Sequence, residues 1–131
     1  MLLPRSTFLT LASVVALAIG AFAIVLPQQF LLGKGVAVPN LAAAVWMREL
    51  GVSILALGVI LFWVRRHADS ATLRAVLWGN ALVQLGLLAT ELVAYRERVI
   101  PLVSGILPNS VLHVVLASGF LAYAARPRGL E

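Results

Sequence analysis

The stretch TFLTLASVVALAIGAFAIVL, residues 7–26, contains no charged side chain. Twenty residues of α-helix rise about 30 Å, which is the thickness of the hydrocarbon core of a bilayer. Pro27 follows the stretch and is expected to end the helix, because proline lacks the backbone N–H that would continue it. The segment therefore predicts a membrane-spanning helix over about residues 7–26.

Three further long apolar segments predict helices over about residues 41–66, 71–96 and 110–125. The last would rise only about 24 Å, so it is expected either to start nearer Pro101 or to cross a thin part of the bundle. The predicted fold is all-α and consists of one domain, residues 1–131. It forms an integral membrane four-helix bundle with up-down-up-down order.

The composition of the chain also favours a membrane protein. Of its 131 residues, 62% are hydrophobic and 11% are charged, and the charges lie in short clusters between the apolar runs. The net charge of +5 does not form a basic patch on a polar face, so nucleic acid is not an expected partner. The absence of cysteine excludes disulfides and thiol ligands, and a lone histidine with scattered carboxylates does not predict a metal site.

Basic residues near the ends of the predicted spans indicate the orientation of the chain. The side that holds both termini and the second connection carries Arg5, Arg65, Arg66, Arg74, Arg126 and Arg128. The opposite side carries Lys34, Arg96 and Arg98. Because cytoplasmic loops are enriched in Lys and Arg, this difference predicts that both termini are cytoplasmic.

Small residues recur along the first two predicted helices. Ala12, Ala16 and Gly20 are spaced every four residues, and Gly51 and Gly58 are seven apart. Such faces allow helix backbones to approach closely in a membrane, although the first stripe is also compatible with a lipid-facing surface.

Two predicted loops end in a Pro-Asn pair that can cap the next helix. These loops cover residues 28–40 and 97–109, so Asn40 and Asn109 are the expected capping residues.

Four ionisable side chains lie inside predicted spans, where each is expensive unless it has a partner or a function. Arg48 and Glu49 are near the start of the second helix, Glu91 is near the end of the third, and His113 is near the start of the fourth. In an up-down-up-down bundle these three helix ends lie on the same side. The rise per residue places Arg48, Glu91 and His113 at similar depths of about 6 to 10 Å, so we expect them to meet in one layer.

Further polar and aromatic side chains are expected to line a pocket around this layer. Asn80, Gln84 and Glu91 share one face of the third helix, at spacings of four and seven. Trp46 and Trp78 are candidate walls, and Asn109 lies one turn before His113. The pattern predicts a polar pocket, open toward the non-cytoplasmic face, that binds a lipophilic small molecule.

Each polar residue has an expected role in that pocket. Arg48 is the fixed cation that grips the polar end of the ligand, and Glu91 and His113 are a titratable pair suited to acid–base catalysis. Glu49 either pairs with Arg48 or faces the lipid headgroups. The pattern indicates neither a particular cofactor nor a particular reaction.

A purely structural interpretation of the same residues stays open. In it, Arg48 and Glu91 form an interhelical ion pair, His113 bonds Asn109, and Asn80 and Gln84 join helices. Two other functions stay open as well. The chain could be a structural or assembly subunit of a larger membrane redox complex, in contact with copies of itself or with other chains, or it could transport protons or ions along the polar face of the third helix.

Residues 48–51, Arg-Glu-Leu-Gly, together with Gly58, residues 65–66 and Pro27, resemble the second helix and first helix end of small four-helix membrane proteins of the DoxX-like group. The resemblance covers the first half of the chain. It implies a left-handed four-helix bundle in a bacterial inner membrane. Some members are associated with quinone-linked or thiol-linked redox systems, and the absence of cysteine argues against the thiol-linked role.

Overall fold

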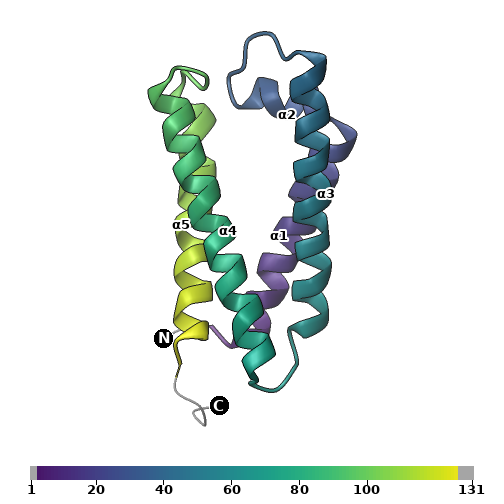
Figure 1. Ribbon diagram of the computed structural model, residues 1–131, viewed down its shortest axis with the longest axis vertical. Coiled ribbons are helices and arrows are strands. Elements are labelled where there is room, and N and C mark those ends of the chain that lie inside the picture. Colours follow the sequence, from purple (N-terminus) through teal and green to yellow (C-terminus); the bar gives the residue numbers. More distant parts are fainter. Residues whose placement is uncertain (1–2, 127–131) are drawn as a thin grey trace.

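The computed structural model describes residues 3–126, and every regular element among them is an α-helix (Figure 1). The five helices are α1 (Arg5–Val25), α2 (Pro27–Gly33), α3 (Leu41–Val64), α4 (Ala71–Arg96) and α5 (Val103–Ala124). All except α2 are long and apolar enough to cross a membrane, judged by length and composition. The all-α prediction is confirmed, and the chain has the properties of a multi-pass membrane protein.

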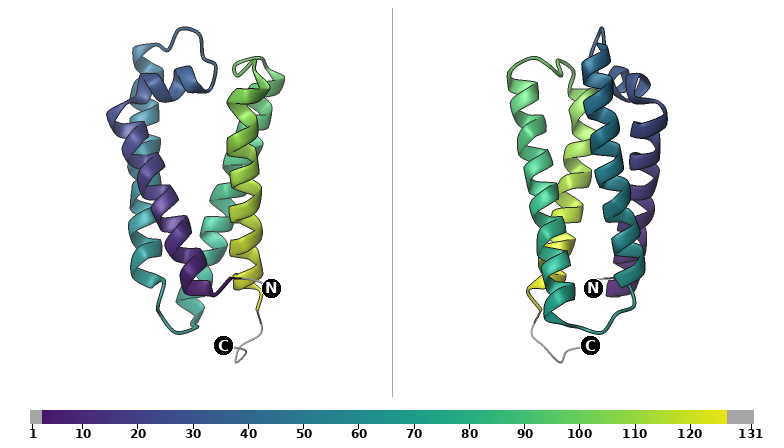
Figure 2. Two further views of the ribbon diagram at one scale, coloured as in Figure 1. Left: turned by 180° about the vertical axis from the view of Figure 1, so that it is seen from behind. Right: turned by 45° about the vertical axis from the view of Figure 1, so that its right-hand side comes forward.

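The predicted loop over residues 28–40 was wrong in its first half, because Pro27 begins a helix as well as ending one. It occupies the first position of α2, where a proline is tolerated because the first backbone N–H groups of a helix have no partner within it. The short helix turns the chain back over the space between the long helices (Figure 2).

Asparagine caps the second long helix as predicted, but not the last one. The Asn40 side chain accepts a hydrogen bond of 2.7 Å from the backbone N–H of Ala43 at the start of α3. The last helix starts at Val103 rather than Ser110, so Asn109 lies inside α5 and caps nothing. Pro108 is accommodated within the helix, and the earlier start removes the length deficit expected for this span.

Helix α1 packs along α3, and α4 packs along α5. Glycines bring the first pair very close together: a Cβ atom added at Gly20 would lie 2.8 Å from the carbonyl oxygen of Gly51. Gly58 is in similar proximity to Leu17, and the buried Ser13 hydroxyl donates a 2.7 Å hydrogen bond to the Gly58 carbonyl. The close helix contact predicted from the small residues is therefore confirmed as α1 against α3.

The main hydrophobic core lies at the end of the molecule that holds the 65–70 turn and the described chain ends. It contains Leu9, Ala12, Leu61, Leu73, Leu77, Ala81, Phe120, Tyr123 and Ala124. At this end the Tyr123 hydroxyl donates to the Leu3 carbonyl, and Arg5 donates a 2.8 Å hydrogen bond to the His67 carbonyl. The two helix pairs are closest here and diverge toward α2 (Figures 1 and 2).

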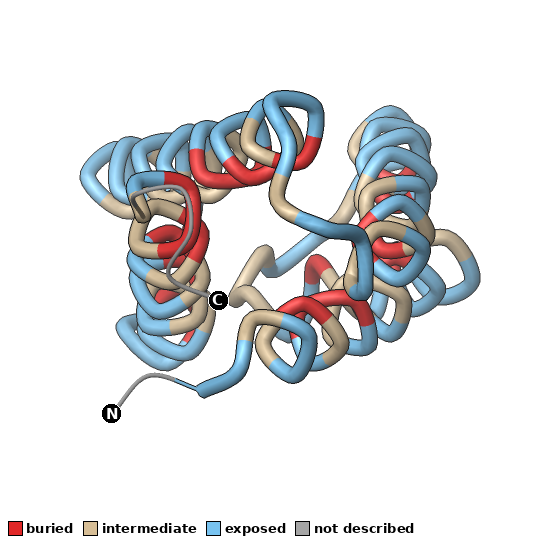
Figure 3. The backbone as a smooth tube through the Cα atoms, turned by 90° about the horizontal axis from the view of Figure 1, so that it is seen from below, coloured by how far each residue is buried: buried red, intermediate tan, exposed pale blue. Residues whose placement is uncertain are grey.

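Seen from the core end, the four long helices are arranged around a common centre (Figure 3). Their buried residues face inward, and the outward surface is largely exposed. That outward surface includes many large apolar side chains, such as Leu82, Trp63 and Val25. An apolar exterior of this extent is typical of a surface that faces lipid rather than water.

Candidate functional site

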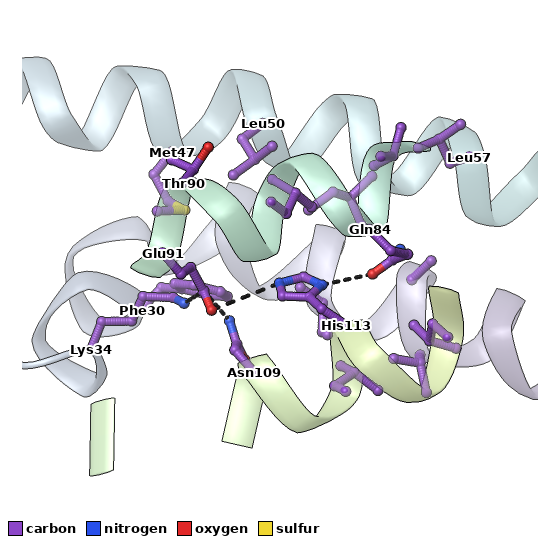
Figure 4. A pocket seen from close by; sticks show the side chains of 18 of the residues that line it. Phe30, Lys34, Met47, Leu50, Leu57, Gln84, Thr90, Glu91, Asn109 and His113 are labelled. Carbon is purple, nitrogen blue, oxygen red and sulfur yellow. Dashed lines mark hydrogen bonds and ion pairs between the residues drawn. The ribbon is translucent and has the colours of Figure 1, made fainter. Parts of the chain in front are cut away.

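A cavity of about 270 Å³ lies between the two helix pairs, and side chains from all five helices line it (Figure 4). Most of the lining is aliphatic or aromatic, including Ile19, Leu57, Leu87, Leu116 and Phe120. At the α2 end the lining becomes polar. The cavity is therefore an apolar space with one polar end, which is the usual chemistry of a small-molecule site.

Glu91 is the centre of the polar end. One carboxylate oxygen, Oε1, accepts a hydrogen bond from Lys34 Nζ, and the same oxygen accepts a 2.9 Å bond from Asn109 Nδ2. The side chains of Lys34 and Glu91 are only 14% and 12% exposed, so this is a largely buried ion pair. It links the loop after α2 to α4 and therefore joins the two halves of the molecule.

The second carboxylate oxygen of Glu91, Oε2, is buried and has no hydrogen-bond partner among residues 3–126. His113 Nε2 lies 3.9 Å from it, too far for a direct hydrogen bond. An unsatisfied charged oxygen inside a protein carries a large desolvation penalty, so this atom is an exception that calls for an explanation. Figure 4 shows the carboxylate and the imidazole pointing toward each other across the polar end.

Gln84 fixes the other side of the imidazole. Its Oε1 lies 2.7 Å from His113 Nδ1. Because an amide oxygen only accepts hydrogen bonds, Nδ1 carries a hydrogen and donates it to Gln84. The remaining ring nitrogen, Nε2, is therefore the atom presented to Glu91.

Helical spacing explains why these groups meet. Gln84 and Glu91 are seven residues apart on α4, and Asn109 and His113 are four apart on α5, so each pair lies on one helix face. Glu91 and His113 of the predicted layer lie close together, and Gln84 lines the same cavity. The predicted bond between His113 and Asn109 was wrong, because each side chain bonds to α4 instead.

Arg48 does not reach the cavity, so its predicted convergence with Glu91 was wrong, as was the alternative ion pair between them. Its exposed side chain lies between α3 and α1, and Nε donates a 3.3 Å hydrogen bond to the Ile24 carbonyl. That carbonyl belongs to the last turn of α1, where no helical N–H is left to bond it. Arg48 therefore supplies a hydrogen-bond donor to a backbone carbonyl group at the C-terminal end of α1.

The remaining predicted site residues divide between the cavity and the surface. Glu49 is exposed and does not line the cavity. Trp46 and Trp78 are 69% and 51% exposed and point outward, so the prediction that they form aromatic walls was wrong. Asn80 does line the cavity, but its side chain donates a 2.9 Å hydrogen bond to the Val76 carbonyl of its own helix.

Lys34 is the charged cavity residue that the sequence pattern did not reveal. Its position depends on α2, which folds the chain back over the cavity, and on Gly105 of α5. A Cβ atom at Gly105 would lie 2.3 Å from the Lys34 carbonyl oxygen, so only glycine allows the loop to dock there. Two features of the sequence could have indicated the position of Lys34: Pro27, which can begin a helix, and the fact that Lys34 is the one lysine of the chain.

Within residues 3–126, no group of three or more His, Cys, Asp or Glu side chains is placed to hold a metal ion. The chemistry offered by the described side chains at this site is hydrogen bonding and proton exchange, centred on Glu91 and His113. Comparison with protein-family models, curated proteins and solved structures gave no match. The fold and the cavity define a class only: an all-helical protein with four candidate membrane spans around an apolar cavity with one polar end.

Proposed function

We propose that the chain is a multi-pass membrane protein that binds a lipophilic small molecule in this cavity, with the polar end of the molecule against Glu91 and His113. The observation that carries the proposal is Glu91 Oε2, which lacks a hydrogen bond within the described part of the chain and lies at the polar end of an otherwise apolar space. An apolar lining with a few convergent polar groups is the general pattern of a ligand pocket. The proposed arrangement is an up-down-up-down four-helix bundle.

The proposed location is a bacterial inner membrane with both termini in the cytoplasm. The core end carries Arg5, Arg65, Arg66 and Arg126, and an excess of basic residues favours the cytoplasmic side. Arg128, which contributes to the same argument, lies outside the described residues. Relation to the DoxX-like group stays a prediction.

The cavity suits a ligand larger than a single aromatic ring. An enclosed apolar space of about 150 Å³ is enough to bind benzene, and this cavity measures about 270 Å³. Its apolar lining continues from the polar end to Phe120, which is itself part of the core. An apolar body would therefore extend toward the core, and the facing pair of Glu91 and His113 would be available for acid–base chemistry on the polar end.

Two alternatives have less support from the contacts. Transport requires a polar path across the molecule, but beyond Asn80 the described interior is the hydrophobic core of Leu9, Leu61, Leu77 and Phe120. Assembly into a larger complex was favoured by the small-residue face of the first helix, and Ala16 and Gly20 of that face are already used against α3.

Filling the cavity is expected to abolish binding. Leu87→Trp places a larger side chain from α4 into the cavity, whereas Leu82→Trp alters the same helix at a position that is 72% exposed and outside the cavity. With para-pentylphenol as the probe, calorimetry in detergent micelles should show at least a roughly tenfold weaker affinity for Leu87→Trp, about 1.4 kcal/mol or more. Equal affinities of Leu87→Trp, Leu82→Trp and the unaltered chain would contradict the proposed function.

A further inference from the structure

We infer that the molecule bound in this cavity presents an uncharged hydroxyl group, as an alcohol or a phenol does, which donates a hydrogen bond to Glu91 Oε2 beside His113. This inference rests on the proposed function and specifies the chemical class of its ligand. The neighbouring polar atoms already have partners. Lys34 and Asn109 occupy Glu91 Oε1, and Gln84 occupies His113 Nδ1.

The two atoms of this cluster that lack a hydrogen bond among the described residues are Glu91 Oε2 and His113 Nε2, and the space beside them admits one hydroxyl oxygen. They lie 3.9 Å apart. A hydroxyl oxygen beside the imidazole can therefore stand at the usual hydrogen-bond length of about 2.7 to 2.9 Å from Glu91 Oε2. With its hydrogen on Nδ1, the neutral imidazole of His113 presents Nε2 as an acceptor. The hydroxyl therefore donates its single hydrogen to Glu91 Oε2 and gives that oxygen its missing partner. An ether or a ketone only accepts hydrogen bonds and would leave Glu91 Oε2 unsatisfied.

The charges at the polar end disfavour both kinds of ionic ligand. A carboxylate would meet the free oxygen of Glu91, because Lys34, the one Lys or Arg among the described lining residues, is bound to the other oxygen. A ligand ammonium would stand close to the Lys34 ammonium on the same carboxylate. Repulsion between like charges is strong where water is scarce, so an uncharged donor is the group that fits.

The test compares three probes that share one apolar body: para-pentylphenol, its methyl ether para-pentylanisole, and para-pentylbenzoate. Binding is measured by calorimetry in detergent micelles, and the heat that remains with Leu87→Trp is subtracted as partition into the micelle. We expect the phenol to bind roughly ten- to a hundredfold more tightly than its ether, the effect of one hydrogen bond to a charged group. The benzoate is expected to bind more weakly than the phenol.

A double variant, Lys34→Met with Glu91→Leu, removes both charges together and keeps the cavity apolar. In this variant the preference for the phenol over the ether is expected to shrink, because the Glu91 carboxylate that accepts the phenol hydrogen is gone. Equal affinity for phenol and ether in the unaltered chain, or tightest binding of the benzoate, would overturn the inference while the proposed function stands. If no probe binds more tightly to the unaltered chain than to Leu87→Trp, both the inference and the proposed function are contradicted. The three-probe comparison needs only the unaltered chain and the blocked-cavity variant, so it decides the matter even if the double variant does not fold.

Discussion

Replacing Gly20 with alanine is expected to lower the free energy of unfolding by about 2 to 3 kcal/mol, the cost of overpacking a tight contact. The added Cβ would stand 2.8 Å from both the Gly51 carbonyl oxygen and the Leu55 backbone nitrogen. Backbone atoms of a helix cannot rotate away as a side chain can. The whole of α1 must therefore move from α3, which also shifts one wall of the cavity.

Gly86→Ala is the matched control, because a Cβ at Gly86 meets nothing within 4 Å and the residue also lies within a membrane-length helix. This change is expected to be neutral or to stabilise by up to about 1 kcal/mol through helix propensity. Both values can be measured by unfolding in mixed micelles with increasing dodecyl sulfate, followed by circular dichroism. Equal effects of the two substitutions would show that the α1–α3 contact is looser than described.

Removing one member of the Lys34–Glu91 pair is expected to destabilise the protein by about 3 kcal/mol, because the partner is then left as an uncompensated charge in a largely buried site. Lys34→Met and Glu91→Leu should each show this loss. The double variant should recover most of it, because an apolar pair of similar volume removes the charges altogether. The same unfolding assay gives all three values.

Together these variants form a double-mutant cycle. It compares the sum of the two single changes in the free energy of unfolding with the change in the double variant. Arg66→Met serves as a control, because Arg66 is exposed, and it should alter stability by no more than about 0.5 kcal/mol. If the single effects simply add, the two charges do not depend on each other, and the ion pair does not join the two halves of the molecule.

Much of the fold could be predicted because long apolar runs leave few alternatives. The limits of α4, which was predicted as the third membrane span, follow from local sequence alone, and so does the cap that Asn40 provides to α3. The proximity of Glu91 and His113 was also accessible, because their depths along the helices are similar, and helical periodicity places Gln84 on the face of Glu91 at a deeper level. These predictions needed only properties of single helices and their order.

What could not be predicted depended on contacts between elements. Lys34 reaches Glu91 only because a short helix begins at Pro27 and Gly105 accepts the loop that follows it. Arg48 was placed on the wrong face of its helix, although it lies one turn before Gly51, whose close contact with α1 marks that face. The glycine spacing therefore held information about Arg48 that its charge and depth did not.

The most direct test of the central claim is a crystal structure of the chain soaked with a bromine-labelled alkylphenol, recorded at the bromine absorption edge. We expect one anomalous peak inside the cavity, among Leu87, Leu116 and Phe120, with the phenol oxygen between Glu91 and His113. Bromine found only on the outward, lipid-facing surfaces, with the space between the helix pairs closed by side chains, would contradict the account.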